Sequence, residues 1–253
     1  TLDLSGYAMS QVIDIRAGSF SDIGGYLRNL SIAVGAIIEN VIGGSGVDVI
    51  TGNGAANKVW AGAGSDSVVG GIGNDSLYGG NNYDTIRGGD GDDRVWGGNG
   101  RDLIFLGNGN DVFWDNAQAD ANGHDRVYGG AGNDTVNGGG GNEVIYGEAG
   151  SDSLIGGIGN DTLWGGADAD RFVFAAGCGS DLVGDFEDGV DTLVLDDALW
   201  GGGLTVVQVI AAHASVIVSD TVFDAAVRRA GVVRVKNVGQ LFYAAKALAS
   251  KFR

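Results

Sequence analysis

The sequence predicts an all-β fold, a parallel β-roll in which a nine-residue repeat winds the chain into stacked coils. Three observations support this prediction. The 253 residues include 49 glycines and no proline, which excludes collagen and fits regular use of glycine in turns. From Gly43 onward one position of every nine is acidic with a single exception, and an apolar residue follows two positions later. A fixed short period of this kind indicates a solenoid with one structural unit per repeat.

The acidic residue occupies the sixth position of each repeat. We count fourteen nonapeptide repeats over residues 43–173, eight of them before an insertion of five residues at 115–119 and six after it. Twelve of the fourteen sixth positions are Asp, and the exceptions are Asn57 and Glu143. Asn57 lacks a charge, and Ala55 in the same repeat stands where the pattern has glycine, so we expect that repeat to be distorted.

The eighth position is apolar in all fourteen repeats. It is Ile50, Val59, Val68, Leu77, Ile86, Val95, Ile104, Phe113, Val127, Val136, Ile145, Leu154, Leu163 and Phe172. Because strand side chains alternate between the two faces of a sheet, we interpret positions seven to nine as a three-residue strand with its middle side chain in the core. Positions one to six then turn the chain around, and glycine permits the backbone angles that such turns need.

Stacking of the coils predicts metal sites. Two repeats make one coil of 18 residues, and coils about 4.8 Å apart bring the carboxylates of repeats n and n+2 together on one edge. These carboxylates repel each other unless a cation lies between them, and carboxylate and turn carbonyl oxygens suit Ca²⁺. Aspartates that only form solvated turns would explain one turn but not the nine-residue period. The predicted carboxylate ligands are Asp48, Asp66, Asp75, Asp84, Asp93, Asp102, Asp111, Asp125, Asp134, Glu143, Asp152, Asp161 and Asp170.

Turn glycines are predicted to add carbonyl ligands. They are Gly44, Gly46, Gly62, Gly64, Gly71, Gly73, Gly89, Gly91, Gly98, Gly100, Gly130, Gly132, Gly157 and Gly159. Eight repeats give six pairs of facing carboxylates and six repeats give four, so we expect about ten calcium ions.

Charge and composition restrict the partners. The chain has 32 acidic and 15 basic residues and a net charge of −17, which disfavours nucleic acids and anionic lipids and favours cations. No apolar run reaches the roughly 18 residues of a membrane span, and no signal peptide opens the chain. The single cysteine, Cys178, cannot form an intrachain disulfide and is expected to be a small buried residue. Because the chain opens at Thr1, we expect it to be part of a longer protein.

The flanks of the repeats differ from each other. Residues 1–42 alternate apolar and polar side chains, which predicts short strands that cap the first coil. Residues 174–253 break the period and predict a mixed α/β cap. Within it, 204–216 suits a short helix or strand, and 237–253 reads as an amphipathic helix capped by Asn237.

Motifs outside the repeats carry a family resemblance. They are TLDLSGY at 1–7, GSFSDIGG at 18–25, IENVIGGSG at 38–46, DRFVF at 170–174 and DFEDGVD at 185–191. Together with the G-G-x-G-x-D-x-U-x repeat of RTX proteins, they make residues 1–200 similar to the C-terminal domain of the serralysin family of secreted bacterial zinc metallopeptidases.

The resemblance implies a function. It implies a bacterial extracellular module that supports secretion through a type I exporter and assists the folding of an attached or separate peptidase domain. It also implies a further calcium site that involves Glu39.

No catalytic apparatus is recognisable in the chain. The peptidase half of the family carries HExxHxxGxxH, whereas this chain has two histidines, His124 and His213, without that motif. No GxSxG elbow or Walker loop is present either, so we expect no catalysis and no zinc, and we expect His124 to be solvated in a repeat turn. The alternative to a peptidase module is an extracellular structural or adhesive repeat protein.

The ninth position carries an aromatic series. Trp60, Tyr78, Trp96 and Trp114 recur every 18 residues, and the same spacing joins Tyr128, Tyr146 and Trp164 after the insertion. If 115–119 bulges from a turn, the aromatic series must change to the other sheet there, and we favour this bulge over a shortened coil. The series either suits a sheet surface generally or marks a face that docks a flanking segment or a partner.

Overall fold

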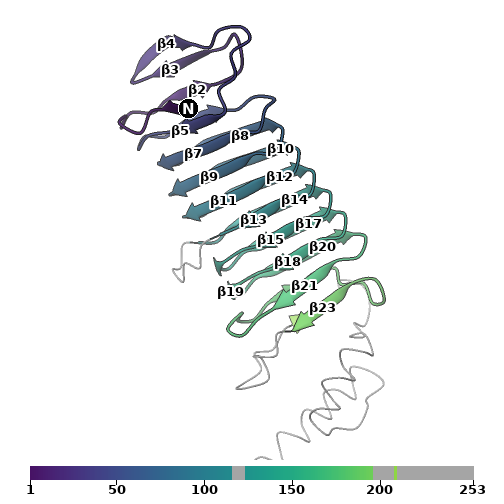
Figure 1. Cartoon of the computed structure of the whole chain (residues 1–253). Helices are drawn as coiled ribbons and strands as arrows, with labels where there is room; N and C mark the ends of the chain where they lie inside the picture. The colour runs from purple at the N-terminus through teal and green to yellow at the C-terminus, as the bar shows by residue number, and fades with distance from the viewer. Residues whose placement is uncertain (116–122, 196–207, 210–253) are drawn as a thin grey trace, which may run out of the picture.

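The chain folds into a stack of parallel coils (Figure 1). The computed structural model describes residues 1–115, 123–195 and 208–209. In these ranges the regular elements are all β-strands, and consecutive repeats supply strands alternately to two long sheets. The predicted all-β parallel roll is therefore confirmed. No helix long and apolar enough to cross a membrane occurs within the described ranges.

The first sheet has ten strands among the described residues. In spatial order they are β1 (Leu2–Asp3), β5 (Asn40–Ile42), β7 (Lys58–Ala63), β9 (Ser76–Asn81), β11 (Arg94–Asn99), β13 (Val112–Trp114), β15 (Thr135–Asn137), β18 (Ser153–Ile155), β21 (Arg171–Phe174) and β23 (Thr192–Leu195).

The second sheet has twelve strands in the same ranges. In spatial order they are β24 (Gln208–Val209), β22 (Leu182–Val183), β20 (Thr162–Ala167), β17 (Val144–Ala149), β14 (Arg126–Ala131), β12 (Leu103–Asn108), β10 (Thr85–Asp90), β8 (Ser67–Ile72), β6 (Val49–Thr51), β2 (Val12–Asp14), β3 (Phe20–Ile23) and β4 (Tyr26–Ser31). A small additional pair joins β16 (Gly140–Gly141) to β19 (Ile158–Gly159).

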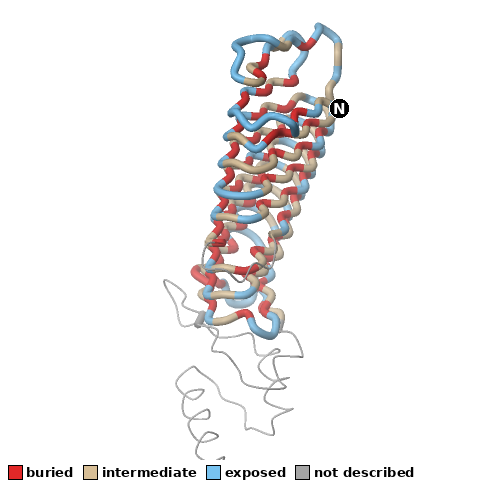
Figure 2. The backbone as a smooth tube through the Cα atoms, turned by 90° about the vertical axis from the view of Figure 1, so that its left-hand side faces the viewer, coloured by how far each residue is buried: buried red, intermediate tan, exposed pale blue. Residues whose placement is uncertain are grey.

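The core is a column of eighth-position side chains. All fourteen are fully buried, with 0% of their surface exposed. They stack because partners in register lie one coil apart, as Val59 pairs with Leu77 and Ile86 with Ile104. Figure 2 shows buried residues recurring at the same places in coil after coil. The predicted inward position is confirmed, and Cys178 lies in the same core with 4% exposed.

Many of the repeat strands are longer than the three residues predicted, although β6, β13, β15 and β18 keep that length. In β7 the pairing with β9 covers residues 58–60 and resumes at Gly62 and Ala63. Gly62 has φ +118°, which a residue with a side chain rarely adopts. Glycine at the second position therefore keeps the backbone extended enough to continue the sheet beyond the ninth position.

The insertion is a bulge and not a shortened coil. Trp114 in β13 pairs with Asn137 in β15, whereas Tyr128 in β14 pairs with Phe105 in β12. The aromatic series thus changes sheets, as predicted for a bulge. One stack runs from Trp60 to Trp114 with ring centroids 4.3–5.7 Å apart. The other runs from Phe105 to Trp164 at 5.0–6.4 Å.

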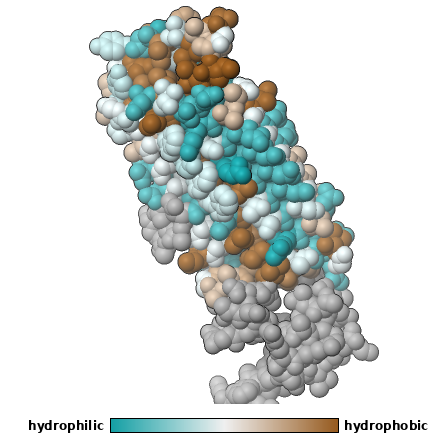
Figure 3. Space-filling model, viewed as in Figure 1, coloured by the Kyte–Doolittle hydropathy of each residue, from teal (hydrophilic) through white to brown (hydrophobic). Residues whose placement is uncertain are grey.

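The N-terminal residues form strands, as predicted. β1 and β2 extend the two sheets in parallel register, pairing with β5 and β6. Strands β3 and β4 then form an antiparallel hairpin at the end of the stack. Figure 3 shows apolar side chains gathered over this end, where Tyr26 is 71% and Leu27 83% exposed.

The parallel pairing continues beyond residue 173. Strand β22 pairs with β20, β23 pairs with β21, and β24 pairs with β22. The segment predicted at 204–216 is described only at β24, and the helix predicted over 237–253 lies outside the described residues. The division at residues 42 and 173 stays a prediction.

Candidate calcium-binding ladders

The sixth-position carboxylates form a hydrogen-bonded ladder along each edge of the roll. The Oδ1 atom of Asp66 accepts the backbone N–H of Asp48 at 2.7 Å, and Asp111 accepts that of Asp93 at 2.7 Å. The first ladder joins Asp48, Asp66, Asp84, Asp102 and Asp125 by such bonds and then Glu143, Asp161 and Asp181; the Glu143 carboxylate does not accept the N–H of Asp125. The second contains Asn57, Asp75, Asp93, Asp111, Asp134, Asp152, Asp170 and Asp191.

Both ladders extend across the insertion and beyond the last predicted repeat, whereas the repeat spacing indicated two separate groups of carboxylates. Asp125 accepts the N–H of Asp102 at 2.7 Å, and Asp134 accepts that of Asp111 at 2.8 Å, so the bulge interrupts neither ladder. The expectation of separate groups of six and four pairs was therefore wrong, because carboxylates on either side of the insertion still pair between adjacent coils. At the far end Asp181 and Asp191 add a rung to each ladder.

The second carboxylate oxygen is buried without a partner. The Oδ2 atoms that have no hydrogen-bond partner among the described residues include those of Asp66, Asp75, Asp84, Asp93, Asp102, Asp111, Asp125, Asp134, Asp152, Asp161 and Asp170. These residues are at most 2% exposed. Burial of an unpaired charged oxygen is costly unless a cation or donor meets it. The interior of both ladders therefore fits a bound cation.

The ends of the ladders contrast with their interior. Asp48 accepts N–H groups from Gln11 and Gly44, both at 2.9 Å, so each of its oxygens has a donor. Asp191 likewise accepts from Asp170 at 3.0 Å and from Glu187 at 2.7 Å. Backbone donors thus satisfy both oxygens of Asp48 at one end of the first ladder and of Asp191 at one end of the second. The interior Oδ2 atoms lack such donors among the described residues, and so does Oδ2 of Asp181 at the other end of the first ladder.

Glycine leaves room beside these oxygens. A Cβ atom on Gly79, at the first position of its repeat, would lie 2.5 Å from Oδ2 of Asp84. At the second position, a Cβ on Gly89 would overlap the carbonyl oxygen of Gly71 in the preceding coil. The first-position glycines were not among the predicted site residues, although their recurrence in most repeats could have indicated them; Ala61, Leu106 and Asp120 are the exceptions. The carbonyl ligands predicted at second and fourth positions remain a prediction.

The repeat of Asn57 lacks a free oxygen. Its side-chain oxygen accepts the N–H of Asn53 at 2.8 Å, and its amide donates to Asn53 Oδ1 at 3.2 Å. Glu143 differs again, since both of its carboxylate oxygens are buried without a hydrogen-bond partner in the described ranges. Glu39 is exposed, and its carbonyl accepts the N–H of Lys58 at 2.7 Å. A calcium role for Glu39 stays a prediction.

Burial disfavours the charged form of the ladder carboxylates. It raises the pKa of Asp84 to about 8 and that of Asp93 to about 7, and neighbouring ladder carboxylates add to both shifts. The pKa of Glu143 is also raised, first by burial and then by Asp161. A divalent cation would reverse this electrostatic balance.

A second set of side chains stacks beside one ladder, at the fifth positions. Oδ1 of Asn110 accepts the N–H of Asn133, and Oδ1 of Asn133 accepts that of Ser151, both at 2.8 Å. Beside the other ladder His124 Nδ1 accepts the N–H of Asn142 at 2.9 Å. His124 was expected to be solvated in a repeat turn; it is partly exposed there and also takes part in the turn hydrogen bonding. The sequence analysis did not identify the fifth position, because different polar residues, Asn, Asp, Ser and His, occupy it in different repeats.

Known protein families match this chain over its repeats and its N-terminal strands. The family model for the peptidase M10 serralysin C-terminal domain matches residues 1–128. The chain belongs to this family. The model for RTX calcium-binding nonapeptide repeats matches residues 121–154 and 146–177. The chain is therefore a serralysin-type module with calcium-binding repeats, and these are non-catalytic parts of the family.

Serralysins are among the similar proteins. Serralysin G of Dickeya chrysanthemi is 58% identical, and serralysin of Proteus mirabilis 57% identical, over 53 residues. Metallopeptidase AprA of Pseudomonas marginalis is 53% identical over 53 residues. Each match covers 21% of this chain and 11% of the relative, so the chain spans about a tenth of the length of the relatives it matches.

Proposed function

We propose that this serralysin-type module folds when it meets extracellular calcium, and that the two carboxylate ladders hold the ions. The observation that carries the proposal is the contrast between satisfied and unsatisfied oxygens. Backbone N–H groups satisfy both oxygens of Asp48 in the first ladder and of Asp191 in the second, whereas Oδ2 of the interior Asp rungs of both ladders is buried without a partner in the described ranges.

Calcium when bound supplies positive charge and accepts oxygen ligands between stacked carboxylates. Asp66, Asp84 and Asp102 would hold it along one edge, and Asp75, Asp93 and Asp111 along the other. Asn57 would contribute little, because its side-chain oxygen already accepts an N–H group. We retain about ten ions as the expected number, with the carboxylate pairs across the insertion, Asp102 with Asp125 and Asp111 with Asp134, allowing further sites there.

Substitution of a ladder aspartate tests the assignment. Asp93→Ala removes the oxygen that accepts the Asp75 N–H at 2.8 Å and the unpartnered Oδ2. We expect it to raise the calcium concentration at the folding midpoint by about tenfold, as loss of one charged ligand weakens calcium binding. Asn57→Ala should raise that midpoint less. Circular dichroism during calcium titration measures both midpoints.

Asp93→Asn is the matched control, because an amide oxygen still accepts the Asp75 N–H while the charge is lost. We expect its midpoint to lie close to that of Asp93→Ala. Equal midpoints for wild type, Asp93→Asn and Asp93→Ala would contradict the assignment of Asp93 as a ligand.

We further infer that the module serves an attached or separate peptidase in a secreted bacterial protein. Low cytosolic calcium would keep the repeats unfolded for a type I exporter, and higher extracellular calcium would then fold them. Family membership and the calcium-binding repeats support this proposal. An extracellular structural or adhesive role is the second candidate, and calcium-dependent self-association of the pure chain would favour it.

The chain by itself should not act as a peptidase. Its two histidines, His124 and His213, cannot supply the three protein ligands of a catalytic zinc site of the HExxHxxGxxH type. We expect no cleavage of casein by the purified 253-residue chain, with or without added zinc. Hydrolysis that depends on zinc and persists through repeated purification would overturn this expectation.

A further inference from the structure

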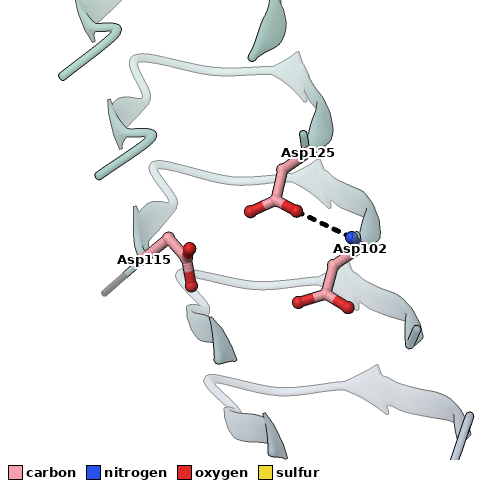
Figure 4. Close-up of side chains that lie close together, drawn as sticks. All are labelled: Asp102, Asp115 and Asp125. Carbon is pink, nitrogen blue, oxygen red and sulfur yellow. Dashed lines mark hydrogen bonds between the residues drawn. The ribbon is translucent and has the colours of Figure 1, made fainter. Parts of the chain in front are cut away.

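An additional carboxylate approaches the first ladder where the insertion begins. Asp115 lies at the start of the insertion and follows β13, while Asp102 and Asp125 are successive rungs of the ladder. One oxygen from each of these three residues lies within 4.8 Å of the others. Figure 4 shows the Asp115 carboxylate facing the two ladder carboxylates across the coil.

The insertion explains how Asp115 reaches this place. Its N–H donates to the carbonyl of Asn137 at 3.0 Å, as the N–H of Gly138 does to Ile155 one coil later. Asp115 therefore occupies a first position of the repeat, where Gly97 precedes it and Gly138 follows it in the stack. A side chain is accommodated there, and its Oδ1 accepts the N–H of Gly98 at 2.8 Å.

Two buried oxygens face the same space. Oδ2 of Asp102 and Oδ2 of Asp125 have no hydrogen-bond partner within the described residues, and these residues are 2% and 1% exposed. A Cβ on Gly97 would lie 2.6 Å from Oδ2 of Asp102 and 3.3 Å from Oδ1 of Asp115. The glycine thus leaves open the space that these two carboxylates share.

We propose that Asp102, Asp115 and Asp125 form a three-carboxylate site that binds calcium, or a trivalent lanthanide, more tightly than the two-carboxylate steps of the same ladder. This inference rests on the proposed calcium function and assigns a distinct role to the insertion. Affinity for hard cations rises with the number of charged ligands and with the rigidity of the site. Here two ligands are ladder rungs and the third is fixed by Gly98.

The site would be the first to fill and the last to empty. It lies between β11 and β15, near the middle of the stack, so a cation held there joins the coils before and after the bulge. The extra charge of Asp115 therefore strengthens the step where the repeat spacing changes from 18 to 23 residues.

Terbium titration of the folded chain tests the proposal. The full chain is kept in a calcium concentration that maintains its strand signal, and terbium is added from below one equivalent to several equivalents while emission excited through tryptophan is recorded. We expect wild type to show a tight class of one equivalent, with apparent affinity about tenfold or more above the remaining sites. Asp115→Asn should lose that class, although its amide oxygen can still accept the Gly98 N–H.

Asp92→Asn is the matched control. Asp92 is exposed and accepts the N–H of Asn110 at 2.9 Å, so the variant loses one charge nearby and keeps its hydrogen bond. It should retain the tight class. A tight class that survives in Asp115→Asn would overturn the inference, as would its loss in both variants to the same extent.

Two outcomes are kept separate by the design. If wild type binds no calcium at all, the proposed calcium-binding function is wrong, and the proposed role of Asp115 is wrong with it. If Asp115→Asn does not reach the native strand signal in saturating calcium, Asp115→Ser is judged by the same criterion, since it removes the carboxylate and keeps an oxygen beside Gly98.

Discussion

Removal of calcium from the purified chain is expected to abolish its native strand signal in circular dichroism, and restoration of millimolar calcium to recover it. The physical reason lies in the ladders, where each coil places a buried carboxylate beside that of the next coil. Without a cation, the unpartnered Oδ2 atoms of residues such as Asp84 and Asp93 carry an uncompensated desolvation cost.

The expected size of this effect matches the stability of a domain. Extracellular calcium modules bind at roughly 10⁻⁴–10⁻³ M. At calcium about tenfold above the dissociation constant each site adds about 1.4 kcal/mol. About ten independent sites then contribute about 14 kcal/mol, against a typical stability of about 5–15 kcal/mol. Native strand signal that persists at pH 8 after calcium has been removed on a chelating resin would contradict the mechanism.

The same experiment has a pH control. Burial raises the pKa of Asp84 to about 8 and that of Asp66 to about 6, from an ordinary value of 3.8. A raised pKa means that the calcium-free folded chain binds more protons than the unfolded chain between pH 4 and 8, so its stability falls as pH rises through that window. Calcium-free chain should therefore retain more strand signal at pH 5 than at pH 8.

The fold could be predicted from the sequence at positions where a single physical requirement fixes the type of residue. An apolar eighth position is required because that side chain faces the core, and Val59, Leu77 and Val95 are all fully buried. The bulge at 115–119 could also be predicted, because an aromatic series with an 18-residue period must either stay in register or change sheets. The length of the strands could not be predicted from the sequence, since it depends on the positive φ of glycines such as Gly62.

The ends and the insertion of the candidate site could not be predicted from spacing. Asp181 lies 11 residues after Asp170, and Asp191 lies 10 residues after Asp181. Both therefore leave the nine-residue period while the strands keep the stack. Asp115 could not be recognised either. Its approach to Asp102 depends on which coil receives the residues after the bulge, and only the pairing of β13 with β15 decides that.

Substitution of Gly89 by alanine is expected to destabilise the calcium-loaded roll by about 3 kcal/mol. Two costs combine. Gly89 has φ +124°, and an L residue with positive φ costs about 1–2 kcal/mol. Its new Cβ would also meet the carbonyl of Gly71 in the preceding coil, and overpacking of this kind costs about 1–3 kcal/mol.

Two other glycines separate these costs. Gly54 has no atom within 4 Å of a Cβ and no positive φ, so Gly54→Ala should change the free energy of unfolding by less than about 1 kcal/mol. Gly177 has equally open surroundings but φ +87°, so Gly177→Ala should show the backbone cost alone, about 1–2 kcal/mol. Denaturant unfolding at fixed saturating calcium measures all three variants.

The chain itself limits how large the Gly89 effect can be. Glu148 occupies the same second position in a later repeat and has φ +77°, and Asn82 and Asp168 occupy fourth positions at φ +78° and +75°. The turn thus accommodates a side chain by rotating toward the left-handed helical region, where the strain is smaller than at +124°. Gly89→Ala should therefore weaken the roll without unfolding it in saturating calcium. Equal free energies of unfolding for the Gly89 and Gly54 variants would show that coil-to-coil contact at the second position does not limit the stack.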